Sequence, residues 1–239
     1  MKQQMIFERY EMKYMLTKNQ KAAVLKAMED YMALDKYGRV TIRNIYFDTD
    51  TYRLIRRSSE RPAYKEKLRV RSYRSAGDDD EVFVELKKKY KSIVYKRRIA
   101  LPQKLVLDCL EGGRHLPAQS QIAEEINYFC DYYKNLLPSV FLSYEREAFY
   151  ALDGSDFRVT FDENILTRQQ DFNFAREIYG RKLIDDDTTL MELKTSGGLP
   201  LWMVHCLSEN KIYKSSFSKY GKAYIETIQN QWQGGLLHA

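Results

Sequence analysis

Polar and apolar residues alternate at a period of two through much of this sequence, which predicts a protein built mainly from β-strands. Few helices accompany these strands, so the sequence favours an α+β protein. We expect an eight-stranded antiparallel β-barrel with helices packed outside it and at the C-terminus. The eight predicted strands are Ile6–Met15, Thr41–Asp48, Tyr64–Tyr73, Val82–Lys89, Ile93–Leu101, Val140–Tyr150, Phe157–Asp162 and Thr188–Thr195. The predicted helices are Thr17–Met32, Leu101–Glu111, Ser120–Leu137, Phe217–Trp232 and an apolar helix around Trp202 and Cys206.

The composition excludes a mainly disordered chain, since 44% of the 239 residues are hydrophobic and 30% are charged. No low-complexity linker interrupts it, and we expect a single domain over residues 1–239. The uncharged stretch Thr195–Ser208 is too short to span a bilayer and contains Pro200, so membrane insertion is not expected. Without an apolar signal segment or a CxxC pair among the three cysteines, the expected location is the cytoplasm.

The polar faces of the predicted strands repeat lysine and arginine, with an occasional carboxylate. In one strand Arg69 and Arg71 share a face with Lys65 and Lys67. On any single strand such a face is ordinary solvated surface, but its repetition over seven strands is not. Inside a barrel these charges would repel one another, and a wide, wet lumen that receives a dense polyanion would tolerate them. Interspersed carboxylates could also hold Mg²⁺ or Mn²⁺, which bind oxygen ligands and bridge phosphates.

Eight short motifs occur in a fixed order along the chain. They are FERYEMKY, IRNIYFDT, KLRVRSY, VFVELKKKY, FLSYEREAFY, FRVTFDENI, LMELKT and SFSKY. No single motif is specific, but their order resembles the VTC (vacuolar transporter chaperone) domain, in the polyphosphate polymerase branch of the triphosphate tunnel metalloenzymes. This superfamily is related to the CYTH proteins. The resemblance runs from about Phe7 to Tyr220.

This resemblance implies an antiparallel tunnel that binds ATP, inorganic triphosphate or polyphosphate with Mn²⁺ or Mg²⁺. It implies transfer of the γ-phosphate of ATP to a growing polyphosphate chain, here in a stand-alone bacterial form. The family's catalytic phosphate-binding positions correspond to Lys13, Arg69, Arg71, Lys87, Lys96, Arg146, Arg158 and Lys194. Its further phosphate contacts correspond to Tyr144, Ser218 and Lys219. Glu192 matches the metal-binding glutamate, with Glu11, Glu85 and Asp162 as candidate helpers through water.

Two positions depart from the pattern of the wider superfamily. The CYTH proteins open with ExExK, whereas Arg9 stands here in place of the first glutamate. This exchange resembles the polymerase branch and removes one carboxylate available to a second metal. Ser216 stands where polymerases tend to have a basic residue, although Lys214 is close in the sequence.

Two other functions remain open on the sequence alone. A metal-dependent inorganic triphosphatase would use water as the nucleophile, with Glu11 or Glu85 as the base. A non-catalytic polyphosphate or inositol-polyphosphate binder would gain nothing from a buried carboxylate at Glu192. Nucleic-acid binding is not expected, because most of the nineteen tyrosines fall opposite the basic residues and not among them.

Overall fold

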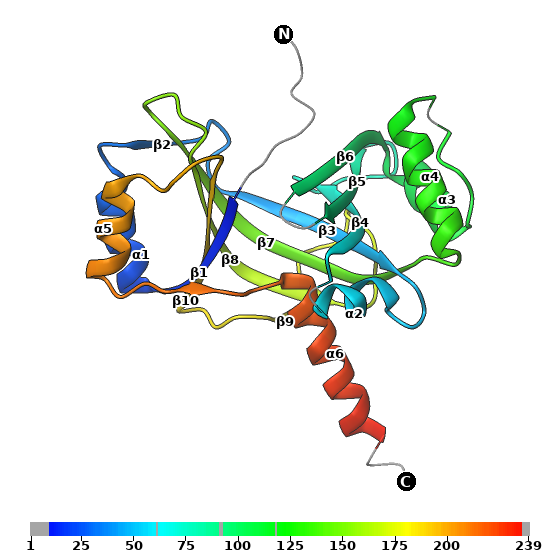
Figure 1. The fold of residues 1–239 in the computed structure, drawn as a ribbon. Coiled ribbons are helices and arrows are strands. Elements are labelled where there is room, and N and C mark those ends of the chain that lie inside the picture. The colour runs from blue at the N-terminus through cyan, green and yellow to red at the C-terminus, as the bar shows by residue number, and fades with distance from the viewer. Residues whose placement is uncertain (1–9, 61, 91–92, 118, 236–239) are drawn as a thin grey trace. The chain divides into compact units, whose positions relative to one another are not determined.

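Long strands form most of the chain, as the alternation predicts (Figure 1). The computed structural model describes residues 10–60, 62–90, 93–117 and 119–235. The strands are β1 (Tyr10–Thr17), β2 (Met32–Leu34), β3 (Val40–Asp48), β4 (Tyr64–Ser72), β5 (Glu81–Tyr90), β6 (Ile93–Pro102), β7 (Leu137–Ala151), β8 (Arg158–Arg168), β9 (Arg181–Lys182), β10 (Thr188–Thr195) and β11 (Lys214–Ser215). The helices are α1 (Lys18–Met28), α2 (Arg53–Ser59), α3 (Gln103–Glu111), α4 (Gln121–Tyr133), α5 (Leu201–Glu209) and α6 (Lys219–Gly235).

Each of the eight predicted strands corresponds to one long strand, but the predicted closed, eight-stranded barrel is wrong. The sheet has eleven strands in the order β11-β1-β10-β8-β7-β3-β4-β5-β6, with β2 paired to β7 and β9 to β8. The three extra strands contain only two or three residues, which is too few to show a period. In the described chain no pairing joins β6 to the other end of this order, so the sheet stays open. At that other end, β11 pairs with the outer edge of β1, where Lys13 and Tyr14 lie opposite Ser215 and Lys214.

The chain divides into two compact units. The first contains the chain up to Thr41 together with Tyr144–Ile165 and Ile184–Phe217. The second contains Ile42–Ser143, Leu166–Leu183 and the chain from Ser218 onward. A single domain over the whole chain stays a prediction.

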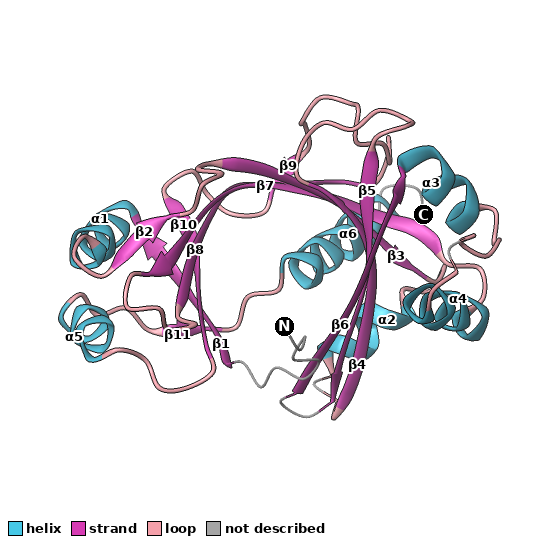
Figure 2. Cartoon of the chain, turned by 90° about the horizontal axis from the view of Figure 1, so that it is seen from above, coloured by secondary structure: helices cyan, strands magenta, loops and turns pink. Residues whose placement is uncertain are grey.

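Helices α1 and α5 cover one face of the β1–β10–β8 sheet in the first unit (Figure 2). Tyr14, Phe161 and Met191 on this face are buried against Val24 of α1 and Met203 of α5. A capping box of Thr17 and Gln20 begins α1, because each residue's side chain accepts a hydrogen bond from the backbone N–H of the other. The opposite face of these strands therefore carries the polar residues of the alternation.

Helices α3 and α4 cover one face of the β4–β5 strands in the second unit (Figure 2). Val70 and Val84 lie in a core with Val106 of α3 and with Ile126 and Phe129 of α4. The burial of this apolar face fixes the register of the strands, because a slip by one residue would place every side chain on the wrong face. Lysines and arginines consequently lie on the other face.

Helix α2 was not predicted, because it has seven residues and begins after Tyr52, a left-handed residue whose side chain makes no capping hydrogen bond. The buried carboxylate of Asp48, at the end of β3, performs the capping. It accepts hydrogen bonds from the backbone N–H groups of Leu54 (2.8 Å) and Ile55 (3.0 Å) and from the hydroxyl of Tyr220 (2.8 Å). This one carboxylate therefore ties α2 and the start of α6 to the sheet. Among the described residues, none of the helices combines the length and apolar character that a bilayer span requires.

Candidate functional site

Strand register gathers the predicted first-unit residues on the sheet face opposite α1 and α5. Residues directly opposite each other in neighbouring strands share a face. The opposed pairs on this face are Glu11 with Lys194, Lys13 with Glu192, Glu192 with Thr160, and Lys194 with Arg158. Of these residues, Glu11 and Arg158 are exposed to solvent.

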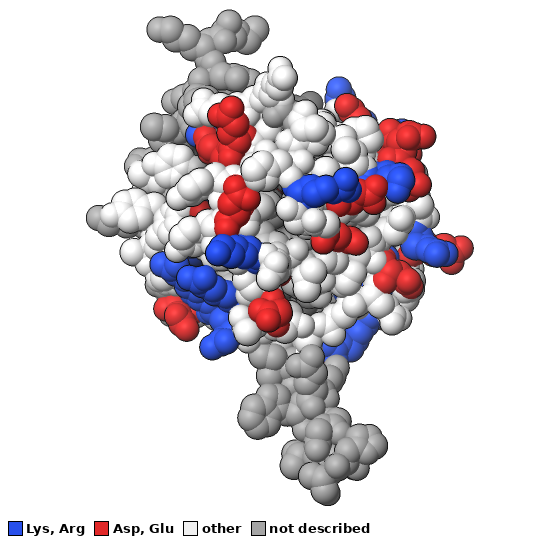
Figure 3. All heavy atoms as spheres, turned by 90° about the vertical axis from the view of Figure 1, so that its right-hand side faces the viewer, with Lys and Arg blue, Asp and Glu red and all other residues white. Residues whose placement is uncertain are grey.

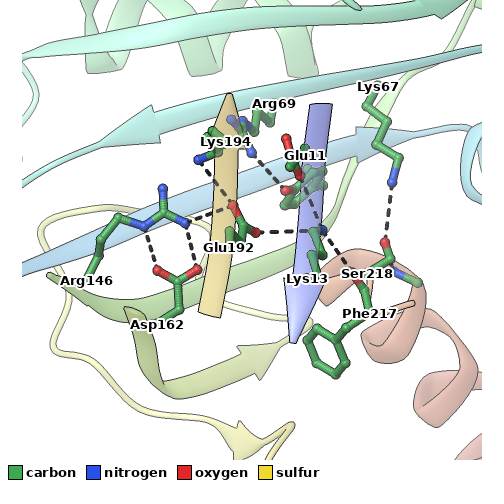
Figure 4. Close-up of polar contacts among 12 residues, drawn as sticks. Glu11, Lys13, Lys67, Arg69, Arg146, Asp162, Glu192, Lys194, Phe217 and Ser218 are labelled. Atoms are coloured by element: carbon green, nitrogen blue, oxygen red, sulfur yellow. Dashed lines mark hydrogen bonds and ion pairs between the residues drawn. The ribbon is translucent and has the colours of Figure 1, made fainter. Parts of the chain in front are cut away.

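Glu192 lies among three cations in this first cluster and is only 6% exposed (Figure 4). Its carboxylate oxygens are 3.2 Å from Lys194 Nζ, 3.6 Å from Lys13 Nζ and 3.8 Å from Arg146 Nη2. Burial lowers the pKa of Lys194, and Arg146 adds to this lowering while Glu192 opposes it. Lys13, Arg146 and Lys194 therefore all place positive charge around Glu192.

Arg146 and Asp162 form a bidentate ion pair beside Glu192 (Figure 4). The guanidinium donates to the two carboxylate oxygens at 2.5 and 2.6 Å, and Asp162 is completely buried. Burial opposes the charge of Arg146, but Tyr144 and Asp162 more than offset this and raise its pKa well above the ordinary value. The ring of buried Tyr144 lies 5.1 Å from the guanidinium carbon. Arg146 therefore stays charged and fixed in orientation.

Lys13 connects this cluster to the segment before α6. Its ammonium donates to the carbonyl oxygen of Phe217 at 2.9 Å and lies 3.6 Å from Glu11 Oε1 (Figure 4). Glu11 and Glu192 therefore both approach one ammonium. Arg9 lies outside the described residues, and Ser216 is exposed.

A second cationic cluster covers the free face of β4, β5 and β6 in the second unit. Strand register arranges it in transverse rows. The rows are Lys67–Lys87–Lys96, then Tyr46–Arg69–Glu85–Arg98, then Asn44–Arg71–Phe83–Ala100. In the lysine row like charges lie directly opposite each other, an arrangement that destabilises a sheet unless an anion neutralises it.

Glu85 is the counter-ion at the centre of this second cluster and is 1% exposed. Its Oε2 accepts from Arg69 Nε at 2.8 Å, and its Oε1 lies 2.8 Å from Lys96 Nζ. Burial alone would raise the pKa of Glu85, but Arg69, Arg71 and Lys96 bring it far below the ordinary value. This carboxylate is therefore ionised at any physiological pH.

Ser218 places the start of α6 against the lysine row. Its hydroxyl oxygen accepts from the backbone N–H of Gly221 at 3.1 Å and lies 3.5 Å from Lys67 Nζ (Figure 4). Lys219 follows in the first turn of α6 and is half-buried. An ammonium beside a helix N-terminus is a favourable place for a phosphate oxygen.

Tyr46 belongs to this second cluster but was not among the predicted site residues. Its hydroxyl accepts from Arg69 Nη1 at 3.1 Å, and its ring stacks on Tyr220 with the centroids 4.6 Å apart. Burial would raise the pKa of Tyr46, but the charges of Arg69 and Lys67 outweigh burial and lower it to about 8. The alternation in RNIYFD puts Tyr46 and Asn44 on one face, so the sequence pattern did place Tyr46 on the polar face of its strand. Lys67 and Arg98 were missed in the same way, although both lie on faces recognised as basic.

We expect Tyr46 to ionise about two pH units before an ordinary tyrosine. Because its pKa is lower in the folded state than in the unfolded state, the unfolded chain binds more protons between about pH 8 and 10. The contribution of Tyr46 to stability therefore grows as the pH rises through this window and is lost as it falls through about 8. An ultraviolet difference titration of the wild type and Tyr46→Phe measures this. If phenolate still forms near pH 8 in Tyr46→Phe, the signal belongs to another tyrosine.

The face of the molecule drawn in Figure 3 carries charges of both signs. In the view of Figure 3 lysines and arginines are interspersed with aspartates and glutamates. A mixed network also lies on the other face of β7 and β8, where Lys21 Nζ approaches Glu163 (2.8 Å) and Glu147 (3.2 Å). Arg39 pairs with Glu145 and Glu163 in the same network. Such balanced networks are typical of solvated surface and provide controls for the two clusters.

The profile of the VTC domain family matches residues 8–227 of this sequence. The chain belongs to the VTC domain family. Among the curated proteins compared, none matches it. The solved structures similar to this VTC domain include a "putative adenylate cyclase" from Bacillus halodurans, with 14% identity, coverage of 87% of this chain and 92% of that chain, and a TM-score of 0.53.

A second similar structure is a "putative adenylyl cyclase" from Hippeastrum, described as having a dominant triphosphatase activity. It has 15% identity, covers 88% of this chain and 92% of that chain, and gives a TM-score of 0.51. At such low identity these likenesses concern the fold alone.

The resemblance to the triphosphate tunnel metalloenzymes implies dependence on a divalent metal. The described residues of this VTC domain contain no group of three or more His, Cys, Asp or Glu side chains suited to a metal. The chemistry of the available donors still fits, because Mg²⁺ usually binds one or two carboxylates and takes its other ligands from water and substrate phosphates. Glu192 and Glu11, which both approach Lys13 at 3.6 Å, supply such a pair. Asp162 and Glu85 instead have both oxygens close to cations.

Proposed function

We propose that this VTC domain is a metal-dependent polyphosphate polymerase that transfers the γ-phosphate of ATP to a growing polyphosphate chain. The observation that supports it most is the charge of the second cluster. Across its three rows, one carboxylate, Glu85, accompanies six cations, which are Lys67, Arg69, Arg71, Lys87, Lys96 and Arg98. Such an excess of fixed positive charge is stabilised by a ligand with several phosphates.

The proposed reaction needs positioning and neutralisation of charge more than covalent chemistry. A terminal oxygen of the acceptor chain attacks the γ-phosphorus of ATP, and a new P–O–P bond forms. The bond from that phosphorus to the β,γ-bridging oxygen breaks, and ADP leaves with the electron pair. The attacking atom belongs to the substrate, so no nucleophilic side chain is required.

Arginines and lysines contribute differently to this reaction. A guanidinium binds two phosphate oxygens at once, so Arg69, Arg71, Arg146 and Arg158 are proposed to orient the triphosphate. The lysines act as point charges, and Lys13, Lys87, Lys96 and Lys194 are proposed to neutralise the transferred group and the leaving diphosphate. The resemblance to the polyphosphate polymerases assigns residues of both clusters to this same phosphoryl-transfer reaction. Tyr144, Ser218 and Lys219 keep their proposed role as further phosphate contacts.

Glu192, with Glu11, would hold Mn²⁺ or Mg²⁺. When bound, the metal would neutralise charge on the phosphate oxygens. Asp162 and Glu85 are better suited to hold arginines and lysines in place, since each already has both oxygens close to cations.

A triphosphatase is the second candidate, and one observation favours it. The Glu11 side chain is 34% exposed beside Lys13, so it could accept a proton from an attacking water. The fold similarity to the Hippeastrum protein is compatible with this activity. A non-catalytic polyphosphate binder is the third candidate, and the burial of Glu192 speaks against it.

Incubation of the pure protein with ATP and Mn²⁺ or Mg²⁺ tests the proposal directly. We expect polyphosphate chains on a gel stained for polyphosphate, and ADP in equal amount to the phosphate incorporated. A parallel reaction with inorganic triphosphate measures phosphate release. Phosphate release without chains would contradict the polymerase and support the triphosphatase. Inactivity in both reactions, with triphosphate binding retained, would support the binding module.

A further inference from the structure

Two aromatic rings and a guanidinium lie together at the end of the second cluster farthest from its lysine row. Phe83 occupies the row of Arg71, and Tyr73 follows directly after β4 ends at Ser72. The rings of Tyr73 and Phe83 meet edge to face, with the centroids 5.7 Å apart. The guanidinium carbon of Arg98 lies 3.5 Å from the centroid of Phe83 and 5.3 Å from that of Tyr73. We call Tyr73, Phe83 and Arg98 the aromatic platform.

The aromatic platform is accessible, unlike the aromatic residues of the core. Tyr73 is 39% exposed, and the side chain of Arg98 is 33% exposed. Ala100 lies directly opposite Phe83 on β6 and is exposed, so this neighbour adds only a methyl group beside the ring. Phe83 itself is half-buried beneath the Arg98 guanidinium, so Tyr73 is the exposed ring on which another ring can stack.

Arg71 joins the aromatic platform to the phosphate-binding face. Its guanidinium carbon lies 5.8 Å from the Tyr73 centroid, and its Nε donates to Asn44 Oδ1 at 2.9 Å. Along β4, Arg71 and Lys67 are four residues apart, which corresponds to about 13 Å. Along this part of β4, Arg71 and Arg69 come first and Lys67 follows. A ligand with a flat ring at one end and several phosphates at the other matches that order of groups.

Nucleobases are the rings most often recognised in this way. They stack on tyrosine and phenylalanine rings and on arginine guanidinium planes, and this stacking tolerates different bases. We infer that the aromatic platform is a nucleobase subsite, which takes the base of a nucleoside triphosphate whose phosphates lie along β4 toward Lys67. The inference rests on the proposed function and adds the place where the base of the nucleotide binds.

Calorimetric titration with ATP and with inorganic triphosphate, both in the presence of Mg²⁺, tests the subsite. We expect Tyr73→Leu to weaken ATP binding by about ten-fold, as loss of one stacking ring does. Binding of inorganic triphosphate should change by less than about two-fold, because this ligand has no base, and it also reports that the variant is folded. Tyr73→Trp should restore ATP binding. Tyr128→Leu is the matched control, since Tyr128 is 70% exposed on α4 of the same unit.

Three results would overturn the inference. If Tyr73→Leu leaves ATP binding unchanged, the platform does not contact the base. If it weakens ATP and triphosphate equally, Tyr73 supports the phosphate site or the fold. If the wild type binds triphosphate but not ATP, the nucleobase subsite fails while a triphosphatase survives, whereas binding of neither ligand removes the proposed function as well.

Discussion

Glu192→Gln is expected to lower metal-dependent turnover by about 10²–10³-fold while the protein stays folded. The substitution keeps the shape of the side chain but removes the negative charge that a divalent metal requires. It also leaves Lys13 and Lys194 without the carboxylate that lies 3.6 and 3.2 Å from them. The measurement is the initial rate with ATP as a function of Mn²⁺ concentration, together with a circular dichroism spectrum.

Glu163→Gln is the control for this variant. Glu163 lies one residue after Asp162 on β8, on the opposite face of the strand, and pairs with Lys21 at 2.8 Å and Arg39 at 2.9 Å. It is therefore also a carboxylate between two cations, but outside the two clusters. Equal activity of the two variants would remove Glu192 from the metal site. A fall in Glu192→Gln that high Mn²⁺ partly restores would indicate weakened metal binding.

The sequence predicted the faces of the strands because side chains in a strand alternate with a fixed period of two. Once Met12 and Tyr14 are assigned to the core, Glu11 and Lys13 must lie on the other face. The same reasoning placed Glu192 with Lys194, and Arg69 with Arg71. These positions depend only on local geometry, so eight long strands and the face of each charged residue followed without a structure.

The prediction that the sheet closes was wrong, because closure depends on which strand edges meet. β11 contains only Lys214 and Ser215, and no pattern in two residues could show that they pair with the edge of β1. The sequence also could not show which charged side chains pair with one another. Asp162 could be assigned as a helper of the metal from the sequence, whereas its bidentate contact with Arg146 depends on how β7 and β8 bring two side chains together.

Tyrosines were the least predictable residues of the candidate site. The alternation places Tyr46 and Tyr73 on the polar faces of their strands, but a tyrosine ring at such a position does not by itself indicate a polar role. Their polar role arises from neighbours on other strands, such as Arg69 beside Tyr46 and Arg98 beside Tyr73. A periodicity describes one strand at a time and cannot show such contacts.

Arg146→Ala is expected to reduce the free energy of unfolding by about 3–5 kcal/mol, the usual cost of removing one partner of a buried ion pair. Asp162 is completely buried and accepts a short hydrogen bond from Arg146 at each carboxylate oxygen, so the variant removes this bidentate counter-charge from a carboxylate in the interior. Urea denaturation measures the change, provided that the slope of the transition is unchanged. Arg39→Ala is the control. Arg39 is 42% exposed, and exposed pairs contribute only about 0–1 kcal/mol.

The double variant Arg146→Met with Asp162→Leu separates the structural role of the pair from its role toward phosphate. Because apolar residues of similar volume often replace a buried pair at no cost, we expect the double variant to regain most of the lost stability. Triphosphate binding should remain weak in it, since the positive charge is absent. Recovery of both stability and binding would mean that Arg146 only holds Asp162 and does not contact phosphate. A loss in Arg146→Ala no larger than in Arg39→Ala would mean that other groups compensate the buried carboxylate.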